Sequence, residues 1–161
     1  MQPTRLYLIR HGQSAGNAEG RFGGHGPTPL SDLGRRQAEM TAKALAREGI
    51  SAIYSSDLTR AVETAEPLAR LLDLPIHQSP AFRERHVGVL EGLTFDESKE
   101  AYPKDYYALV NRNIHHVITK GESYRHLLRR ITQKVNEVLR LEDQALEGEA
   151  IGGAEVEGYV V

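Results

Sequence analysis

Three adjacent residues near the N-terminus, Arg10-His11-Gly12, have the types needed to handle a phosphate group. They directly follow the apolar run Leu6-Tyr7-Leu8-Ile9, which predicts a fully buried strand over 6–9. Ligands of open α/β sheets bind at the carboxyl ends of the strands. We therefore expect the guanidinium and the imidazole to lie at the tip of a sheet, in a ligand site.

The chemistry that these residue types favour is phosphoryl transfer without a metal ion or a cysteine. The sequence contains no cysteine, which excludes a thiolate nucleophile, a disulfide framework and a thiolate zinc site. An imidazole is partly neutral near pH 7 and can accept a phosphoryl group. An arginine binds phosphate oxygens through its planar fork. Such a site also needs a carboxylic acid to protonate the leaving oxygen.

Two residues further along the chain, Arg60 and Glu84, are candidates for the same site. Arg60 lies one turn into a helix expected over 58–72, so its side chain leans back toward the sheet edge. The N-terminus of that helix also favours an anion. Glu84 lies between short apolar stretches and near a glycine, and Glu91 is a rival carboxylate. A surface position is the ordinary alternative for both acids, and we favour Glu84.

The elements that must position these residues alternate between strands and helices. The expected strands cover 6–9, 50–54 and 75–77, and the expected helices cover 31–49, 58–72, 96–102 and a segment from 122 or 123 onward. This alternation predicts an α/β fold with a mostly parallel sheet between layers of helices. Residues 12–29 form a long glycine-rich loop, and loops of this length are usually functional.

Taken together, the motifs resemble those of the histidine phosphatase superfamily, in its phosphoglycerate-mutase-like branch. The matching segments are Leu8-Ile9-Arg10-His11-Gly12-Gln13-Ser14 with Asn17, Arg21-Phe22-Gly23-Gly24, Thr28-Pro29-Leu30-Ser31 with Gly34, Tyr54-Ser55-Ser56-Asp57-Leu58 with Arg60, Glu84 to Gly92, and Gly121-Glu122-Ser123. They stand in the family's order and near its usual spacings. The resemblance implies a three-layer sandwich of the histidine-phosphatase type, as a single domain over 1–161.

The resemblance also implies a role for each candidate residue. His11 resembles the residue that is transiently phosphorylated, and Glu84 resembles the proton donor. The residues that would bind phosphate or line its pocket are Arg10, Gly12, Asn17, Gly23, Gly24 and Arg60. The implied activity is phosphomonoester hydrolysis in two displacements, in which Glu84 first protonates the leaving alkoxide and then activates water. No metal ion or organic cofactor is implied.

The C-terminal part departs from the family pattern. The family places a second histidine before a glycine at the end of a later strand, but here no histidine follows His126. After Arg140 the chain becomes acidic and glycine-rich, so residues 141–161 are expected to form an atypical tail without a helical stripe. Its one strand-like run is Tyr159-Val160-Val161, and its glycines and glutamates make it a poor replacement strand. We therefore expect missing C-terminal strands and an impaired activity.

Two other functions stay open beside the phosphatase. A phosphotransferase of the phosphoglycerate mutase type would use the same residues. However, the segment 93–120 is short for a substrate lid and lacks paired arginines, and Val87 stands where glycolytic mutases usually carry a tyrosine. A catalytically inactive relative that only binds phosphate is the second alternative.

The overall composition is that of an ordinary globular domain. The 161 residues include 20 basic and 22 acidic ones, for a net charge of −2, so no charge excess points to nucleic acid or an anionic membrane. The sequence shows no apolar run that would span a bilayer and no signal-peptide pattern. We expect a cytoplasmic protein whose partner is a small-molecule phosphomonoester, without a nucleic acid or membrane partner. Composition leaves an oligomer open.

Overall fold

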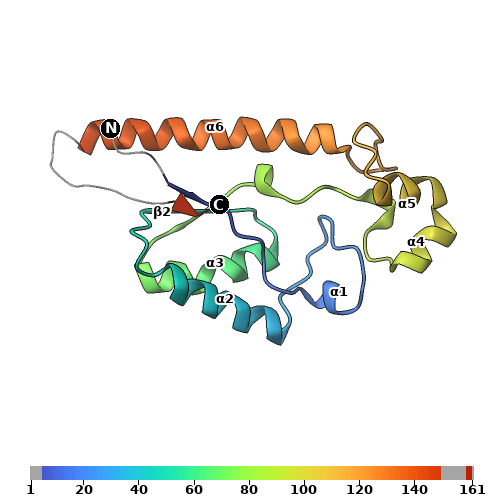
Figure 1. The fold of residues 1–161 in the computed structure, drawn as a ribbon, viewed down its shortest axis with the longest axis horizontal. Helices are drawn as coiled ribbons and strands as arrows, with labels where there is room; N and C mark the ends of the chain where they lie inside the picture. Colours follow the sequence, from blue (N-terminus) through green and yellow to red (C-terminus); the bar gives the residue numbers. More distant parts are fainter. Residues whose placement is uncertain (1–4, 150–158, 161) are drawn as a thin grey trace.

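The computed structural model describes residues 5–149 and 159–160, and it shows a parallel sheet flanked by helices (Figure 1). The strands are β1 (Leu6–Tyr7), β2 (Ala52–Ser55), β3 (Ile76–Gln78) and β4 (Tyr159–Val160). They form one sheet in the order β1-β4-β2-β3, and every neighbouring pair is parallel. The expected α/β class is confirmed.

The helices cover the two faces and one end of this sheet. They are α1 (Ala15–Ala18), α2 (Asp32–Leu45), α3 (Thr59–Leu72), α4 (Phe95–Ala101), α5 (Pro103–Val110) and α6 (Tyr124–Glu149), with the 3₁₀ turns η1 (Pro80–Phe82) and η2 (Gly88–Leu90). Figure 1 shows α6 on one face of the sheet, α2 and α3 on the other, and α4 with α5 beyond its end. This is the expected three-layer arrangement.

Local signals in the sequence explain the two helices that face the site. The Ser31 side chain accepts the backbone N–H of Gly34 and caps α2, as its position before the apolar pattern predicts. α3 begins after Leu58 and ends at Asp73, which has a left-handed conformation with φ 55°. The buried residues of α2, α3 and β2 form the main core cluster, centred on Ile53 and Leu68. This core holds the first turn of α3 beside the sheet.

The first strand differs from the prediction. A buried strand over 6–9 was expected, whereas β1 ends at Tyr7 and the Leu8 residue is 75% exposed. The physical reason is that β4, its neighbour in the described sheet, pairs only with Leu6 and Tyr7. A strand persists where its backbone groups find partners, and the described residues of β4 provide partners for Leu6 and Tyr7.

The tail also differs from the prediction. α6 continues past Arg140 to Glu149, because the segment 141–149 is rich in Leu, Glu, Gln and Ala, which favour helix. β4 lies between β1 and β2, with Tyr159 opposite Leu6 and Ala52. The strand position expected to be vacant is therefore filled in part, since tyrosine and valine favour strands and both flanking strands offer backbone partners. Residues 150–158 and Val161 lie outside the described residues.

Residues 93–120, which show little pattern in the sequence, contain the two short helices α4 and α5. Thr94 caps α4 through a reciprocal pair of hydrogen bonds with Glu97, and Pro103 occupies the first position of α5. The sequence predicts α4 but not α5. Among the described residues, no helix combines the length and the apolar character needed to cross a bilayer.

Candidate active site

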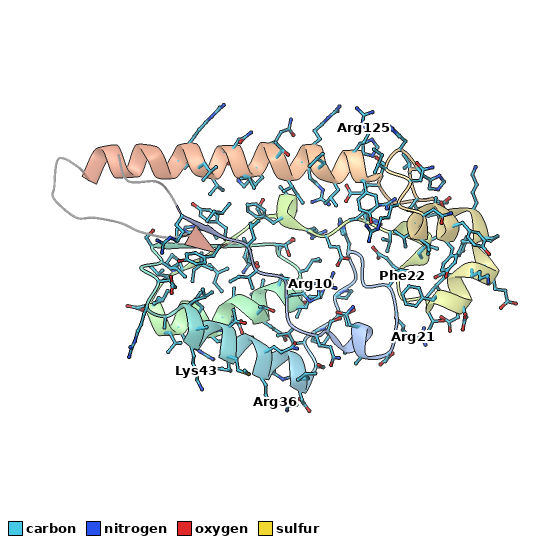
Figure 2. The ribbon with its side chains drawn as sticks, in the orientation of Figure 1. Arg10, Arg21, Phe22, Arg36, Lys43 and Arg125 are labelled. Atoms are coloured by element: carbon cyan, nitrogen blue, oxygen red, sulfur yellow. The ribbon has the colours of Figure 1, made fainter. Side chains whose placement is uncertain are left out.

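One expected site residue, Arg60, lies within hydrogen-bond distance of two others, His11 and Glu84, although the three come from distant parts of the chain. The Arg60 Nε lies 3.2 Å from His11 Nε2, and the Arg60 Nη2 lies 3.1 Å from Glu84 Oε2. Arg10 is exposed and lines the same cavity as these three residues; Figure 2 shows it near the middle of the molecule. The structure therefore brings together one imidazole, two guanidinium groups and one carboxylate.

Arg60 is the buried centre of this cluster. The residue is 1% exposed, and its two terminal nitrogens donate to the carbonyl oxygens of Gly24 at 2.7 Å and Gly26 at 3.1 Å. A buried guanidinium is stable only when its donors have partners. The glycine-rich loop supplies these partners and thereby fixes the direction of the fork toward His11 and Glu84.

The hydrogen bonds of His11 assign one tautomer of its ring. His11 Nδ1 lies 2.7 Å from the carbonyl oxygen of Gly12, so Nδ1 carries the proton and donates it there. His11 Nε2 then accepts from Arg60 Nε and keeps its lone pair on the side of the cluster. Burial lowers the pKa of His11, and the positive charge of Arg60 also lowers it. The hydrogen bond to the Gly12 carbonyl raises the pKa, but the net shift is downward. The structure thus favours a neutral imidazole with its lone pair on Nε2.

Close backbone contacts hold the loop that carries His11. A Cβ atom on Gly12 would lie 2.5 Å from the carbonyl oxygen of Gly34, and one on Gly34 would lie 2.1 Å from that of Gln13. Glycine is therefore required at both positions of this crossing between the loop and α2. The backbone N–H of Gly12 also donates to Thr64 Oγ1 at 3.1 Å, which attaches the loop to α3.

Of the other loop residues expected to line the pocket, Gly23 and Gly24 contact Arg60, whereas Asn17 is part of the cap of α1. Gly24 has φ +47°, and its carbonyl oxygen accepts a hydrogen bond from Arg60. Gly23 lies against the Arg60 guanidinium, because a Cβ atom added to Gly23 would lie 3.5 Å from the guanidinium carbon. The side-chain oxygen of Asn17 accepts the backbone N–H of Ser14 at 3.3 Å in the cap of α1. A phosphate contact by Asn17 stays a prediction.

Of the two rival carboxylates, Glu84 is the one at the cluster. The Glu84 side chain is 55% exposed and contacts Arg60. Glu91 instead accepts the backbone N–H of His25 at 2.7 Å and lies 3.6 Å from His86 Nδ1. Glu91 therefore supports the glycine-rich loop, and Glu84 is the acid that faces His11.

The sequence reasoning missed two residues that hold the Glu84 segment, Arg130 and Glu122. Arg130 extends from α6 and donates to the carbonyl oxygens of Ala81, Arg83 and Glu84. Glu122 is part of the Gly121-Glu122-Ser123 segment that matches the family, but nothing in the sequence indicated that it contacts Arg130. Arg130 is half-buried on α6 beside Ile131 and three residues after Leu127, and a cation on this apolar face of the helix was the one available signal.

A cavity of about 620 Å³ opens next to the cluster. It continues the strand position of β4, between Leu8-Ile9 and Tyr54-Ser55-Ser56, and reaches His11 and Glu84. Its walls also include Ala65 of α3 and Ile131 of α6. Chemically, the site offers a nucleophilic nitrogen, two cations for phosphate oxygens and a carboxyl group for proton transfer.

The cluster of His11, Arg60 and Glu84 lies where the ligands of open α/β sheets bind. The sequence profile of the histidine phosphatase superfamily, branch 1, matches residues 6–146. This chain belongs to that superfamily, so the resemblance of its motifs is confirmed.

Relatives with known names include mutase-like proteins and phosphatases. The chain is 37% identical over 138 residues to phosphoglycerate mutase-like protein 4 of Arabidopsis thaliana, covering 84% of this chain and 60% of that protein. It is 33% identical over 144 residues to 6-phosphofructo-2-kinase/fructose-2,6-bisphosphatase 3 of Bos taurus, covering 88% of this chain and 30% of that protein. The chain thus spans less than two thirds of the length of these relatives.

Solved structures share the fold and carry phosphatase names. The α-ribazole phosphatase of Shigella flexneri superposes with a TM-score of 0.81 at 25% identity, over 96% of this chain and 71% of that one. A mycobacterial glucosyl-3-phosphoglycerate phosphatase with bound VO3 gives 0.81 at 30% identity, over 99% and 75%. The histidine-phosphatase fold is therefore confirmed.

Proposed function

We propose that this chain is a phosphomonoester hydrolase that acts through a phosphohistidine at His11. The observation that carries the proposal is the position of the unprotonated His11 Nε2, which lies 3.2 Å from the Nε of a buried arginine, Arg60, that also binds Glu84. The nucleophile, the phosphate-binding cation and the proton donor thus share one site. The phosphatase names of the structural neighbours support the same activity.

The reaction would proceed in two displacements. His11 Nε2 attacks phosphorus, the ester P–O bond breaks, and Glu84 donates its proton to the leaving oxygen. Arg10 and Arg60 neutralise the charge on the phosphoryl oxygens. Glu84 then takes a proton from water, the water oxygen attacks phosphorus, and the N–P bond breaks to release inorganic phosphate and neutral His11.

We also propose that this chain turns over slowly. The superfamily site normally contains a second histidine, and no histidine follows His126 here. A lost donor to the transition-state oxygens costs about 3–4 kcal/mol, or roughly a hundred- to a thousandfold in rate. Measured kcat values near those of full-length phosphatase relatives would contradict this impairment.

A small-molecule phosphomonoester is the proposed substrate, in a cytoplasmic protein without a nucleic acid or membrane partner. Hydrolysis is preferred over mutase chemistry because residues 93–120 form only the short helices α4 and α5. A lid that keeps water from a phosphohistidine would need more chain there. The site is proposed to work without a metal ion or organic cofactor.

The test of this function is hydrolysis of p-nitrophenyl phosphate by the wild-type chain, His11→Ala and His115→Ala. His11→Ala should abolish activity, because it removes the nucleophile, whereas His115 is exposed in a distant loop and its loss should have no effect. A chelator should leave the rate unchanged, and ³²P-labelled substrate should yield an acid-labile phosphoenzyme.

Turnover that survives His11→Ala, or that a chelator abolishes, would move the chemistry to another site. Vanadate binding without turnover in the wild-type chain would instead favour the inactive phosphate-binding alternative.

A further inference from the structure

The segment that carries Glu84 is held by one side chain of the neighbouring helix α6. Arg130 Nη1 donates to the carbonyl oxygens of Ala81 at 2.9 Å and Arg83 at 2.7 Å, and Nη2 donates to that of Glu84 at 3.0 Å. A single planar fork thus binds three carbonyl groups within four residues. Side chains with fewer donors do not offer this geometry.

A carboxylate orients this fork. Glu122 accepts hydrogen bonds from both Arg130 Nη2 and Arg130 Nε, the latter at 3.3 Å. The same Glu122 carboxylate accepts the backbone N–H of His86 at 2.9 Å. Burial opposes the ionisation of Glu122, but the hydrogen bonds from Arg130 and His86 outweigh it and lower its pKa. Arg130 and Glu122 together therefore bind the main chain on both sides of Glu84.

This anchoring matters because the Glu84 side chain is itself only loosely enclosed. It is 55% exposed, and its carboxylate contacts the guanidinium of Arg60. The direction of such a side chain depends on where its backbone lies. A displacement of about 1 Å in a catalytic group can cost roughly a hundredfold in rate.

We infer that Arg130 is a positioning residue for Glu84: its guanidinium, oriented by Glu122, holds the main chain of residues 81–86 so that the Glu84 carboxyl faces His11. This inference rests on the proposed function, in which Glu84 is the proton donor. Arg130 itself touches no reacting atom. Its effect on the reaction passes through the backbone of the acid.

The test compares substrates that need the acid to different degrees. An alkyl phosphate such as glycerol 2-phosphate has a poor leaving group that must be protonated, whereas the leaving group of p-nitrophenyl phosphate departs with little help. Arg130→Gln should lower kcat/KM for the alkyl phosphate at least about tenfold more than for the aryl phosphate. Arg129→Gln, an exposed neighbour on the same helix, is the matched control and should change neither rate.

Two more variants separate positioning from general damage to the fold. Arg130→Lys keeps the charge but loses the fork, so it should restore the alkyl phosphate rate only in part. Glu122→Gln keeps an acceptor for His86 but removes the charge that orients Arg130, so it should show the same substrate preference to a smaller degree. Equal losses on both substrates in Arg130→Gln and Glu122→Gln would overturn the inference.

Amide hydrogen exchange provides a readout that does not depend on turnover. The amides of residues 82–86 should exchange faster in Arg130→Gln than in the wild-type chain and Arg129→Gln. Unchanged exchange would overturn the inference even if the chain is an active phosphatase. An inactive wild-type chain would refute the proposed function and the catalytic purpose of the anchor. Faster exchange in Arg130→Gln would in that case still establish that Arg130 anchors residues 82–86.

Discussion

The properties of His11 depend on which atoms its neighbours place against each ring nitrogen. The Gly12 carbonyl oxygen accepts a hydrogen bond from Nδ1–H, so Nε2 presents its lone pair to the side where Arg60 and Glu84 lie. A nucleophile at this position must be neutral before it attacks phosphorus. Burial and the neighbouring arginines favour that neutral form.

The lowered pKa of His11 predicts the acid limb of the pH–rate profile. Since its pKa lies below the usual 6.5, the neutral nucleophile persists as pH falls through 6.5. The acid limb of kcat/KM should therefore have its midpoint below pH 6.5, measured with p-nitrophenyl phosphate at constant ionic strength. An acid limb centred above 6.5 would contradict the burial of a neutral imidazole.

The same shift affects folding stability in a defined direction. The unfolded chain protonates His11 near pH 6.5, whereas the folded chain does so only at lower pH. Protonation thus favours the unfolded state as pH falls below 6.5, and the contribution of His11 to stability becomes less favourable there.

At the scale of elements, the site depends on the crossing between the loop after β1 and the first turn of α2. Gly12 and Gly34 let two backbone segments approach more closely than any side chain would allow. α3 contacts the same loop through Thr64, whose hydroxyl oxygen accepts a hydrogen bond from the backbone N–H of Gly12. His11 and Arg60 therefore owe their relative position to the contacts between this loop, α2 and α3.

Gly34→Ala should destabilise the protein, although alanine normally favours a helix over glycine. The added Cβ would lie 2.1 Å from the carbonyl oxygen of Gln13, so the backbone would have to move. We expect a net loss of about 1–3 kcal/mol in the free energy of unfolding, measured by urea denaturation.

Gly16→Ala is the matched control for this substitution. Gly16 also lies in a helix, α1, but the nearest atom to its added Cβ would be Thr28 Cγ2 at 3.4 Å. Its free energy of unfolding should stay within about 0.5 kcal/mol of that of the wild-type chain. A Gly34→Ala protein as stable as Gly16→Ala would show that the crossing relaxes easily.

For the whole molecule, the sheet position between β1 and β2 is shared by β4 and an apolar cavity. β4 pairs with both neighbours over Tyr159 and Val160, and the cavity of about 620 Å³ continues from there toward His11. α6 covers this region with Ile131, while Leu128 on the same helix is 67% exposed. The site therefore borders an accessible apolar space.

This cavity should bind an uncharged apolar fluorescent dye such as Nile red. Ile131→Lys places a charge on the cavity wall, so it should weaken binding of the dye at least about tenfold, because the ammonium group is costly to desolvate. Leu128→Lys, on the exposed side of the helix, should leave the affinity unchanged. The measurement is a fluorescence titration of each folded protein, and equal affinities of the two variants would place the dye elsewhere.

The sequence alone determined the helices that have a strong local pattern and the chemistry of the site. Apolar spacing predicts α2, α3 and the start of α6, and the Ser31 cap also marks the start of α2, because these signals act between residues a few positions apart. His11, Arg60 and Glu84 were identified by motifs that resemble a known family. The strand limits and α5 were predicted poorly, since short strands depend on their neighbours and α5 has little pattern.

The tertiary structure decided the features that depend on contacts between distant segments. It placed β4 between β1 and β2, and it joined Arg130 to the main chain near Glu84. These contacts involve backbone N–H and C=O groups, which nearly every residue carries and which therefore leave no mark in the sequence. The side chains define the available chemistry, and only the folded chain determines which backbone groups hold them in place.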